Sequence, residues 1–434
     1  MRLVLENIGM LKNAEINLKN LSVIAGENDN GKSTIGKVVF CIIKAMSRYK
    51  EDFQESKEFR VNKLLESAFF SLRSELLDFD NQDSELFTLI NAIHDEESSV
   101  EERLSYFKYL IDDFHFKSNV SKDFLEKTQE EYATAISLID EPEDINGSIE
   151  SALKKVFYAE FDSNILLSGA KEGSIKLFEK KLKLIDIKVL INDEIVLLNE
   201  VNPIELKDAT FIETPLIINN HDLLIRSKSG LSIGNISNRQ LGVPYTTLHT
   251  KDLFDKLIEP SYGNLFKIDT PKEKSLKQTI QNSIEGKIVY DTKKRDFVFK
   301  KQDKDISIKN TASGIKVFGI LQLLSGNGFI NASSILIFDE PENHLHPMWQ
   351  LKLAEILANL AKSGVYILVS SHSPYMIEAL KRYSDKVELE KKTSFYLAEN
   401  RTIENHSKLE EIFIKLAEPF DVFRKMDAEF LRDE

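Results

Sequence analysis

Residues 21–34 of this chain read LSVIAGENDNGKST. The run from Leu21 to Ala25 is apolar and stops at Gly26, which is typical of a buried strand that enters a glycine loop. Gly26-Glu-Asn-Asp-Asn-Gly31-Lys32-Ser33 matches the phosphate-binding pattern G-x-x-x-x-G-K-S/T in full. Apolar residues then recur at helical spacing, namely Ile35, Val38, Val39, Ile42, Ile43 and Met46. Strand, loop and helix follow in the order that this motif requires.

The chemistry of this loop is that of a nucleotide-phosphate cradle. Its glycines let backbone N–H groups curl around phosphate oxygens, and the following helix adds its positive N-terminal end. We expect Lys32 to reach the β- and γ-phosphates of ATP and the Ser33 hydroxyl to ligate Mg²⁺. The predicted nucleotide-binding residues of the loop are Gly26, Glu27, Asn28, Asn30, Gly31, Lys32, Ser33 and Thr34.

Two later segments complete the pattern. The apolar run 335–338 ends in Asp339 and Glu340, which are predicted to hold Mg²⁺ and to orient the attacking water, respectively. The apolar run 365–369 is followed by Ser370-Ser-His372-Ser-Pro374, and we expect His372 to contact the γ-phosphate. Paired acids or a lone histidine are weak signals alone. Their order after the glycine loop favours a catalytic role for Lys32, Glu340 and His372.

The rest of the chain predicts an α/β fold with a mixed sheet and a largely helical insertion. Helical segments alternate with strands over the last third, which indicates parallel βαβ units. Alternating or apolar segments predict strands at 174–178, 182–187, 195–198 and 209–212, and a hairpin near 286–299. Residues 219–244 are predicted to form a loop or lid. A tail strand at 395–397 is expected at a sheet edge. The predicted domains are 1–47, a helical insertion at 48–157, and 158–434.

Composition sets further limits. The formal net charge is -13, which disfavours a surface that binds nucleic acid throughout. The single cysteine, Cys41, falls in the first helix; it is expected to be a core residue and fits a reducing cytoplasm. No run of about 18 apolar residues occurs, so neither a membrane span nor a membrane partner is expected. The sequence therefore predicts a cytoplasmic protein.

GENDNGKST, FDEPENHLHP and SHSP resemble the Walker A, Walker B and switch-histidine motifs of ABC-type ATPases. The opening ENIGMLKNAEINLKNLSVIAGENDNGKST and the segment NTASGIKVFGILQLL are similar to the branch that contains RecF, SMC and the overcoming-lysogenization-defect (OLD) proteins. The combination also resembles ATPase subunits of bacterial anti-phage systems, such as Septu and PARIS, and retron-linked ATPases. The resemblance covers about residues 1–45 and 200–385.

The resemblance implies a homodimer or a higher homo-oligomer with composite ATP sites. In such a dimer a signature loop from one protomer caps the nucleotide of the other; the matching residues here are Ser313 and Gly314, although Ile315 and Lys316 depart from the usual signature. Glu342, His344 and His346 are expected in the segment that meets the second protomer. The loop that supplies a glutamine to Mg²⁺ in the family is not located; Tyr158 to Phe161 is the candidate region.

Three functions follow from these motifs. The leading hypothesis is a sensor or scaffold ATPase of anti-phage defence that controls a separate effector, a toxin or nuclease encoded nearby. The second is a DNA-repair or recombination ATPase that clamps DNA through a basic stretch, which a solvated hairpin face also explains: Lys287, Lys293, Lys294, Arg295, Lys300, Lys301 and Lys304. The third is an ATP-locked scaffold with little turnover.

Overall fold

The computed structural model divides the chain into two compact units. It describes residues 1–77, 91–93, 98–116, 122–140, 144–220, 224, 246–260, 271–302, 304–343, 345–404 and 409–430. The first unit comprises Met1–Ser47 and Ile149–Glu434, and the second comprises Arg48–Ser148. Within the described part of the chain, no helix is long and apolar enough to span a membrane.

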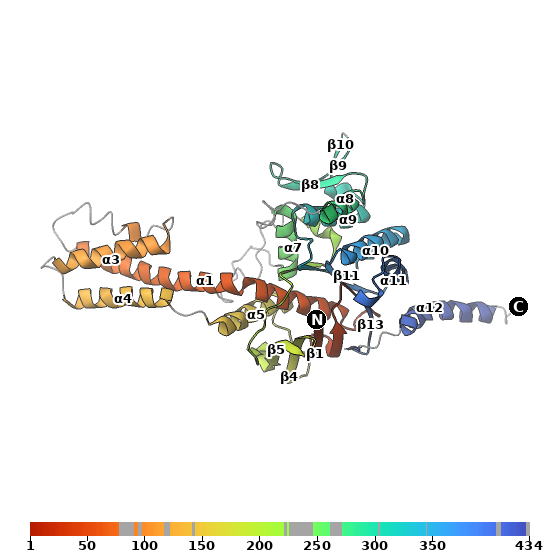
Figure 1. Ribbon diagram of the computed structural model, residues 1–434, viewed down its shortest axis with the longest axis horizontal. Coiled ribbons are helices and arrows are strands. Elements are labelled where there is room, and N and C mark those ends of the chain that lie inside the picture. The colour runs from red at the N-terminus through yellow and green to blue at the C-terminus, as the bar shows by residue number, and fades with distance from the viewer. Residues whose placement is uncertain are drawn as a thin grey trace. The chain divides into compact units, whose positions relative to one another are not determined.

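The first unit is built on a large mixed sheet (Figure 1). Its eleven described strands are β1 (Arg2–Ile8), β2 (Leu11–Asn17), β3 (Leu21–Ala25), β4 (Glu172–Glu179), β5 (Leu182–Leu190), β6 (Ile195–Leu197), β7 (Asp208–Ile212), β11 (Ser334–Asp339), β12 (Tyr366–Ser371), β13 (Thr393–Glu399) and β14 (Thr402–Ile403). They lie in the order β6-β5-β4-β1-β2-β14-β13-β3-β12-β11-β7. A separate three-stranded sheet contains β8 (Lys287–Asp291), β9 (Asp296–Lys301) and β10 (Lys304–Ser307).

The large sheet changes character along its width. From β6 to β2 neighbouring strands are antiparallel, whereas β13, β3, β12, β11 and β7 are mutually parallel. Strands β3 and β11 are buried along their whole length, as expected for parallel strands that are covered on both faces. Because parallel strands end at the same sheet edge, the residues that follow β3, β7, β11 and β12 converge there.

The helices of the first unit follow from apolar spacing and local caps. They include the start of α1 (Lys32–Leu77), the end of α5 (Ile145–Phe161), and then α7 (Leu248–Ile258), α8 (Pro271–Gln281), α9 (Ser313–Gly326), α10 (Pro347–Lys362), α11 (Pro374–Lys386) and α12 (Leu409–Phe430). Helices α10 and α11 each begin with proline directly after a capping side chain, His346 and Ser373. One apolar cluster joins α7 to α11 with the parallel strands and the three-stranded sheet.

The second unit is helical where the structure describes it. It contains the remainder of α1, together with α3 (Val100–Phe116) and α4 (Lys122–Asp140). Its own apolar core includes Leu65, Phe69 and Phe107, and the ring centroids of Phe107 and Tyr132 lie 5.7 Å apart. This unit therefore does not depend on the apolar residues of the large sheet for its own packing.

The predicted α/β fold with a mixed sheet and a helical insertion is confirmed. One local prediction, the edge position of the tail strand, is wrong. The first helix runs on from the glycine loop into the predicted helical insertion and ends at Leu77, because residues 48–77 contain neither glycine nor proline. The tail strand β13 is not at an edge but lies between β3 and β14. Most of the segment predicted as a loop or lid, 219–244, lies outside the described residues.

Candidate functional site

The candidate site lies where four parallel strands end. Ala25 pairs with Ser371, Ser370 with Asp339, and Phe338 with Ile212, so the ends of β3, β12, β11 and β7 form one row. This register brings the glycine loop at residues 26–33 next to the two later motifs, at 339–340 and 370–374. A fourth side chain, that of Glu213 after β7, comes to the same edge.

Lys32 is the cation of the glycine loop. It begins α1 and is almost completely buried. Its Nζ donates to the carbonyl oxygen of Glu27 at 2.8 Å and to Oδ1 of Asn28 at 3.4 Å, and lies 3.5 Å from Oε1 of Glu340. The ammonium group is therefore held between the glycine loop and the end of β11.

Two glycines of the loop are required by close packing. Gly26 has φ +153°, and a Cβ there would collide with the backbone carbonyl oxygen of Ala398. Gly31 has φ +80°, and a Cβ there would lie 2.6 Å from Cδ2 of Leu11. Larger residues would push the loop away from the sheet, so both positions demand glycine for steric reasons in addition to backbone conformation.

Asp339 is a buried carboxylate at the end of β11. It accepts hydrogen bonds from the hydroxyl groups of Ser370 and Ser33. Burial raises its pKa above the ordinary value, the two hydroxyls counteract this, and the charges of Glu340 and Glu213 add to the increase. A carboxylate beside the Ser33 hydroxyl is the oxygen donor set that Mg²⁺ prefers.

Glu340 is aimed by an unusual backbone. Its φ is +48°, a conformation that costs a non-glycine residue energy, and its N–H donates to the Ser370 carbonyl oxygen at 2.9 Å. The Asn343 amide donates to its Oε2 at 3.2 Å, and Nδ1 of His372 lies 3.3 Å from its Oε1. Burial alone would raise the pKa of Glu340, but Asn343, His372 and Lys32 lower it below the ordinary value.

A second carboxylate, Glu342, fixes the histidine loop. Its Oε1 accepts from the Ser371 hydroxyl at 2.7 Å, the His372 N–H at 2.8 Å and the Ser373 N–H at 3.1 Å. Glu342 belongs to the segment that is expected to meet a second protomer, and the residue itself is only 5% exposed. Its position within the protomer explains how His372 is presented next to Glu340.

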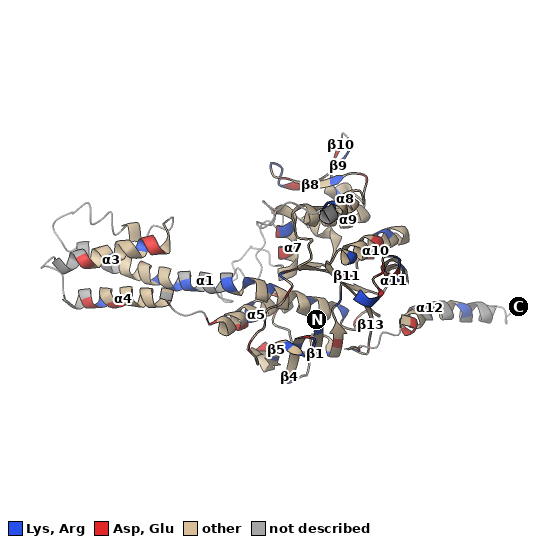
Figure 2. Ribbon diagram, viewed as in Figure 1, with Lys and Arg blue, Asp and Glu red and all other residues tan. Residues whose placement is uncertain are grey.

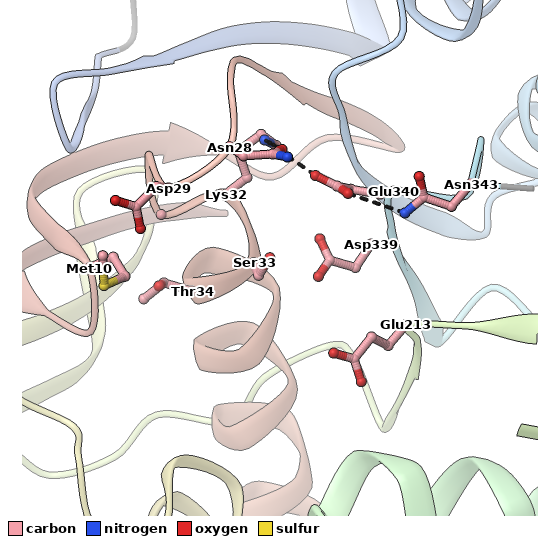
Figure 3. A pocket seen from close by; sticks show the side chains of 11 residues that line it. Met10, Asn28, Asp29, Lys32, Ser33, Thr34, Glu213, Asp339, Glu340 and Asn343 are labelled. Atoms are coloured by element: carbon pink, nitrogen blue, oxygen red, sulfur yellow. Dashed lines mark hydrogen bonds and ion pairs between the residues drawn. The ribbon is translucent and has the colours of Figure 1, made fainter.

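Lys32, Asp339 and Glu340 line one cavity of about 410 Å³ (Figure 3). Its acidic lining residues are Asp29, Glu213, Asp339 and Glu340, and its one basic lining residue within the described chain is Lys32. The four carboxylates outnumber the one ammonium group, so the lining is formally acidic. A polyphosphate, which is also an anion, would be repelled there unless a divalent cation screened the charges. The Ser33 hydroxyl and the Asp339 carboxylate fit Mg²⁺, and Lys32 with the helix N-terminus fits the phosphates.

Residues 1–377 match the AAA ATPase domain family, AAA_15. The chain belongs to this family. No curated protein matches the sequence. The match covers the glycine loop, the acidic strand end and the histidine loop.

Solved structures with a similar chain trace are SMC head domains. The SMC head domain from Thermotoga maritima is 12% identical with a TM-score of 0.36, over 93% of this chain and 96% of that one. The SMC head bound to the C-winged helix domain of ScpA is 11% identical with a TM-score of 0.38, over 95% and 98%. The Smc head with an extended coiled coil, bound to the C-terminal domain of ScpA from Pyrococcus furiosus, is 12% identical with a TM-score of 0.31, over 96% and 98%.

Other residues predicted for the site of this AAA ATPase lie around or away from the cavity. Glu27 contributes its carbonyl oxygen to Lys32, and the Asn30 side chain accepts from the Arg401 N–H at 3.3 Å. Ser313 and Gly314 begin α9 and are not among the described lining residues. His346 is exposed and accepts from the Met348 N–H at the start of α10, whereas His344 lies outside the described residues.

Sequence reasoning missed Glu213 in this AAA ATPase. The candidate region for a Mg²⁺-binding loop, Tyr158 to Phe161, lies in α5 instead, where Glu160 contacts His249. Glu213 follows a short strand that the sequence did predict, at 209–212. The available signal was its place directly after a buried strand, as for Asp339 and His372.

Proposed function

We propose that this AAA ATPase binds and hydrolyses Mg²⁺–ATP in composite sites formed by two copies of the chain. The observation that carries the proposal is the convergence of Lys32, Asp339 and Glu340 at one cavity, with His372 3.3 Å from Glu340. Residue types, spacing and geometry support the same chemistry, that is, phosphate binding, cation binding and orientation of water.

In this proposal, different residues of the site bind the phosphates, the cation and the attacking water. The backbone N–H groups of the glycine loop and Lys32 bind the phosphates, and Ser33 with Asp339 holds the cation. When bound, Mg²⁺ neutralises charge on the phosphate oxygens. Glu340 accepts a hydrogen bond from the attacking water and aligns it, and its lowered pKa keeps it ionised as an acceptor at neutral pH. His372 contacts the γ-phosphate from the neighbouring loop.

Dimerisation follows from the position of the signature residues. Ser313 and Gly314 are at the N-terminus of α9, a favourable end for an anion, but they do not line the described cavity of their own chain. In the proposed dimer they cap the γ-phosphate held by Lys32 of a second copy. Homodimerisation therefore depends on ATP.

The first test is the mass of the purified protein with and without Mg²⁺–ATP, for wild type and Glu340→Gln. We expect ATP to produce a dimer or larger assembly, and Glu340→Gln to trap it because the bound nucleotide persists. A mass that does not respond to ATP, together with absent hydrolysis, contradicts the proposal.

We further propose that the ATP-dependent assembly controls a separate effector, a toxin or nuclease, in anti-phage defence. The resemblance of the motifs to anti-phage ATPases supports this role. The second unit, Arg48–Ser148, has its own core and supplies none of the described cavity-lining residues, so its surface is the candidate partner surface. Failure of every neighbouring gene product to form an ATP-dependent complex contradicts this assignment.

A DNA-clamping ATPase is the second candidate, and the three-stranded sheet favours it. Lys287 and Lys300 lie directly opposite each other across β8 and β9 and both are exposed, which costs stability, although Asp305 of β10 lies opposite Lys300 on its other side. Figure 2 shows acidic residues among these basic ones, and Lys301 is 2.9 Å from Glu285. Salt-sensitive DNA binding that disappears when Lys287 and Lys300 become glutamine would favour this candidate. The third candidate, a static ATP-locked scaffold, predicts that Glu340→Gln changes nothing.

A further inference from the structure

Glu213 is a carboxylate of the cavity that the proposed mechanism does not use. It follows β7, whose Ile212 pairs with Phe338 of β11, so Glu213 reaches the sheet edge next to Asp339. Its side chain is 52% exposed and lines the cavity, where Figure 3 shows its carboxylate on the Asp339 side of the glycine loop. Its charge contributes to the raised pKa of Asp339.

A buried histidine holds this carboxylate. Nε2 of His249, on α7, lies 3.1 Å from Oε2 of Glu213. The side chain of His249 is only 2% exposed, and its ring lies against Phe211 and Phe40 at centroid distances of 4.7 and 6.3 Å. The two aromatic rings restrict the imidazole, so Nε2 has a fixed direction towards Glu213.

Glu160 fixes the other side of the imidazole. Its Oε1 lies 2.6 Å from Nδ1 of His249, and its Oε2 accepts from the His249 backbone N–H at 3.1 Å. The Glu160 side chain is completely buried, and Lys37 Nζ lies 3.8 Å from Oε1. Glu160 therefore has two basic side chains beside it, His249 and Lys37. The buried pair of Glu160 and His249 thus gives the imidazole a fixed orientation, and its second nitrogen contacts the half-exposed carboxylate of Glu213.

The charge of the cavity indicates what Glu213 does there. A fourth carboxylate opposes a polyphosphate unless a cation and its water lie between them. We propose that Glu213 accepts hydrogen bonds from the water around the Mg²⁺ of the bound nucleotide, and that His249 and Glu160 are positioning residues that hold it there. This inference rests on the proposed ATPase function and adds three residues to its site. Residues behind a metal shell commonly change metal affinity about 10- to 100-fold when they are altered.

The test measures binding of a fluorescent ATP analogue to the full chain as a function of free Mg²⁺, with EDTA as the cation-free condition. Glu213→Gln removes the charge at a half-exposed position, where folding tolerates the change. We expect it to raise the Mg²⁺ concentration for half-maximal binding about 10-fold, without weakening binding in EDTA. His249→Gln is expected to shift the Mg²⁺ dependence in the same direction.

Two comparisons separate positioning from stability. The double variant Glu213→Gln/His249→Gln should require no more Mg²⁺ than Glu213→Gln alone, because His249 acts through Glu213. The matched control is Asp252→Asn on the same helix; Asp252 pairs with Lys44 at 2.6 Å and with Lys256 at 3.0 Å and does not line the cavity. It should lower the melting temperature and leave the Mg²⁺ dependence at the wild-type value.

The possible failures are distinguishable. If wild type binds Mg²⁺–ATP and Glu213→Gln has the same Mg²⁺ dependence, the role of Glu213 is wrong and the ATPase proposal stands. If the double variant shows the sum of two separate effects, or if Asp252→Asn shifts the Mg²⁺ dependence equally, the positioning role of His249 is wrong. If wild type binds no nucleotide, the proposed function and this inference both fail.

Discussion

The charge on His249 is predicted to stabilise the first unit in a pH-dependent manner. Burial by itself lowers the pKa of this imidazole, but hydrogen bonds to Glu160 and Glu213 and the charges of both carboxylates raise it to about 9. A protonated imidazole donates from both nitrogens, whereas a neutral one donates from only one and turns a lone pair towards the other carboxylate. Lys37 also faces Glu160, which is completely buried. Loss of the proton therefore weakens contacts among α5, α7 and the end of β7.

The magnitude follows from the two pKa values. His249 has an ordinary pKa of 6.5 when unfolded and about 9 when folded, which corresponds to about 3 kcal/mol at about 1.36 kcal/mol per pH unit. Because the folded state binds the proton more tightly, the full stabilisation is present below pH 6.5 and is lost as the pH rises through about 9. Glu213 is half exposed, so solvent screens its contribution to this stabilisation. The value of about 3 kcal/mol is therefore an upper limit for the stabilisation free energy.

The assay is urea unfolding followed by tryptophan fluorescence. The single tryptophan, Trp349, lies on α10 in the first unit, so the signal reports this unit and not the helical insertion. Wild type and His249→Gln are compared between about pH 6 and about pH 10. We expect the stability advantage of wild type to fall by up to about 3 kcal/mol over this range. A constant difference between the two proteins would refute the protonated bridge.

Further predictions concern the nucleotide site and the basic sheet. Glu340→Gln should lower kcat by on the order of 10²–10⁴-fold while ATP binding persists; steady-state hydrolysis and nucleotide binding check this, and equal loss of both would contradict the water-orienting role. Gly26→Ala should lower the free energy of unfolding by more than about 1 kcal/mol and weaken ATP binding, because the added Cβ would collide with the Ala398 carbonyl oxygen. A melting curve identical to that of the wild type would contradict this prediction. Lys287→Glu, on the edge strand β8, should stabilise the fold by about 0.2–1 kcal/mol by pairing with Lys300; thermal melting tests it against Lys287→Gln, which removes the lysine charge without adding a partner.

The sequence predicted those parts of the site that short motifs contain. The glycine loop, Asp339, Glu340 and His372 each follow an apolar run, and the structure brings them to one sheet edge. Most strands and helices could be predicted because period and length differ clearly between buried strands and amphipathic helices. Ser313 and Gly314 are at the expected helix start, and the role proposed for them depends on a second copy of the chain.

The errors and omissions have physical causes. Strand β13 was predicted at an edge of the sheet, but the place of a strand along the sequence does not determine its place in the sheet. Its burial is explained by pairing with β3 and by the Tyr396 hydroxyl, which receives a hydrogen bond from the Asn17 N–H at 2.8 Å. Glu160 and His249 are 89 residues apart and no motif spacing connects them. Their contact depends on how α5 and α7 pack, which no local pattern encodes.

Strand order supplies an argument that motifs lack. In a parallel sheet, every strand that neighbours a site strand ends at the same edge, so the residue after it is a candidate for the site regardless of its sequence context. Motifs mark three such ends here, after β3, β11 and β12. Strand β7 is the remaining neighbour of β11, and the residue after it is a carboxylate with a buried histidine behind it. A surface turn would not need a buried imidazole to hold it, whereas a carboxylate that must face bound cation water at a fixed distance does. For the same reason, substitution of the half-exposed Glu213 should change the Mg²⁺ dependence of nucleotide binding more directly than substitution of the buried Glu160.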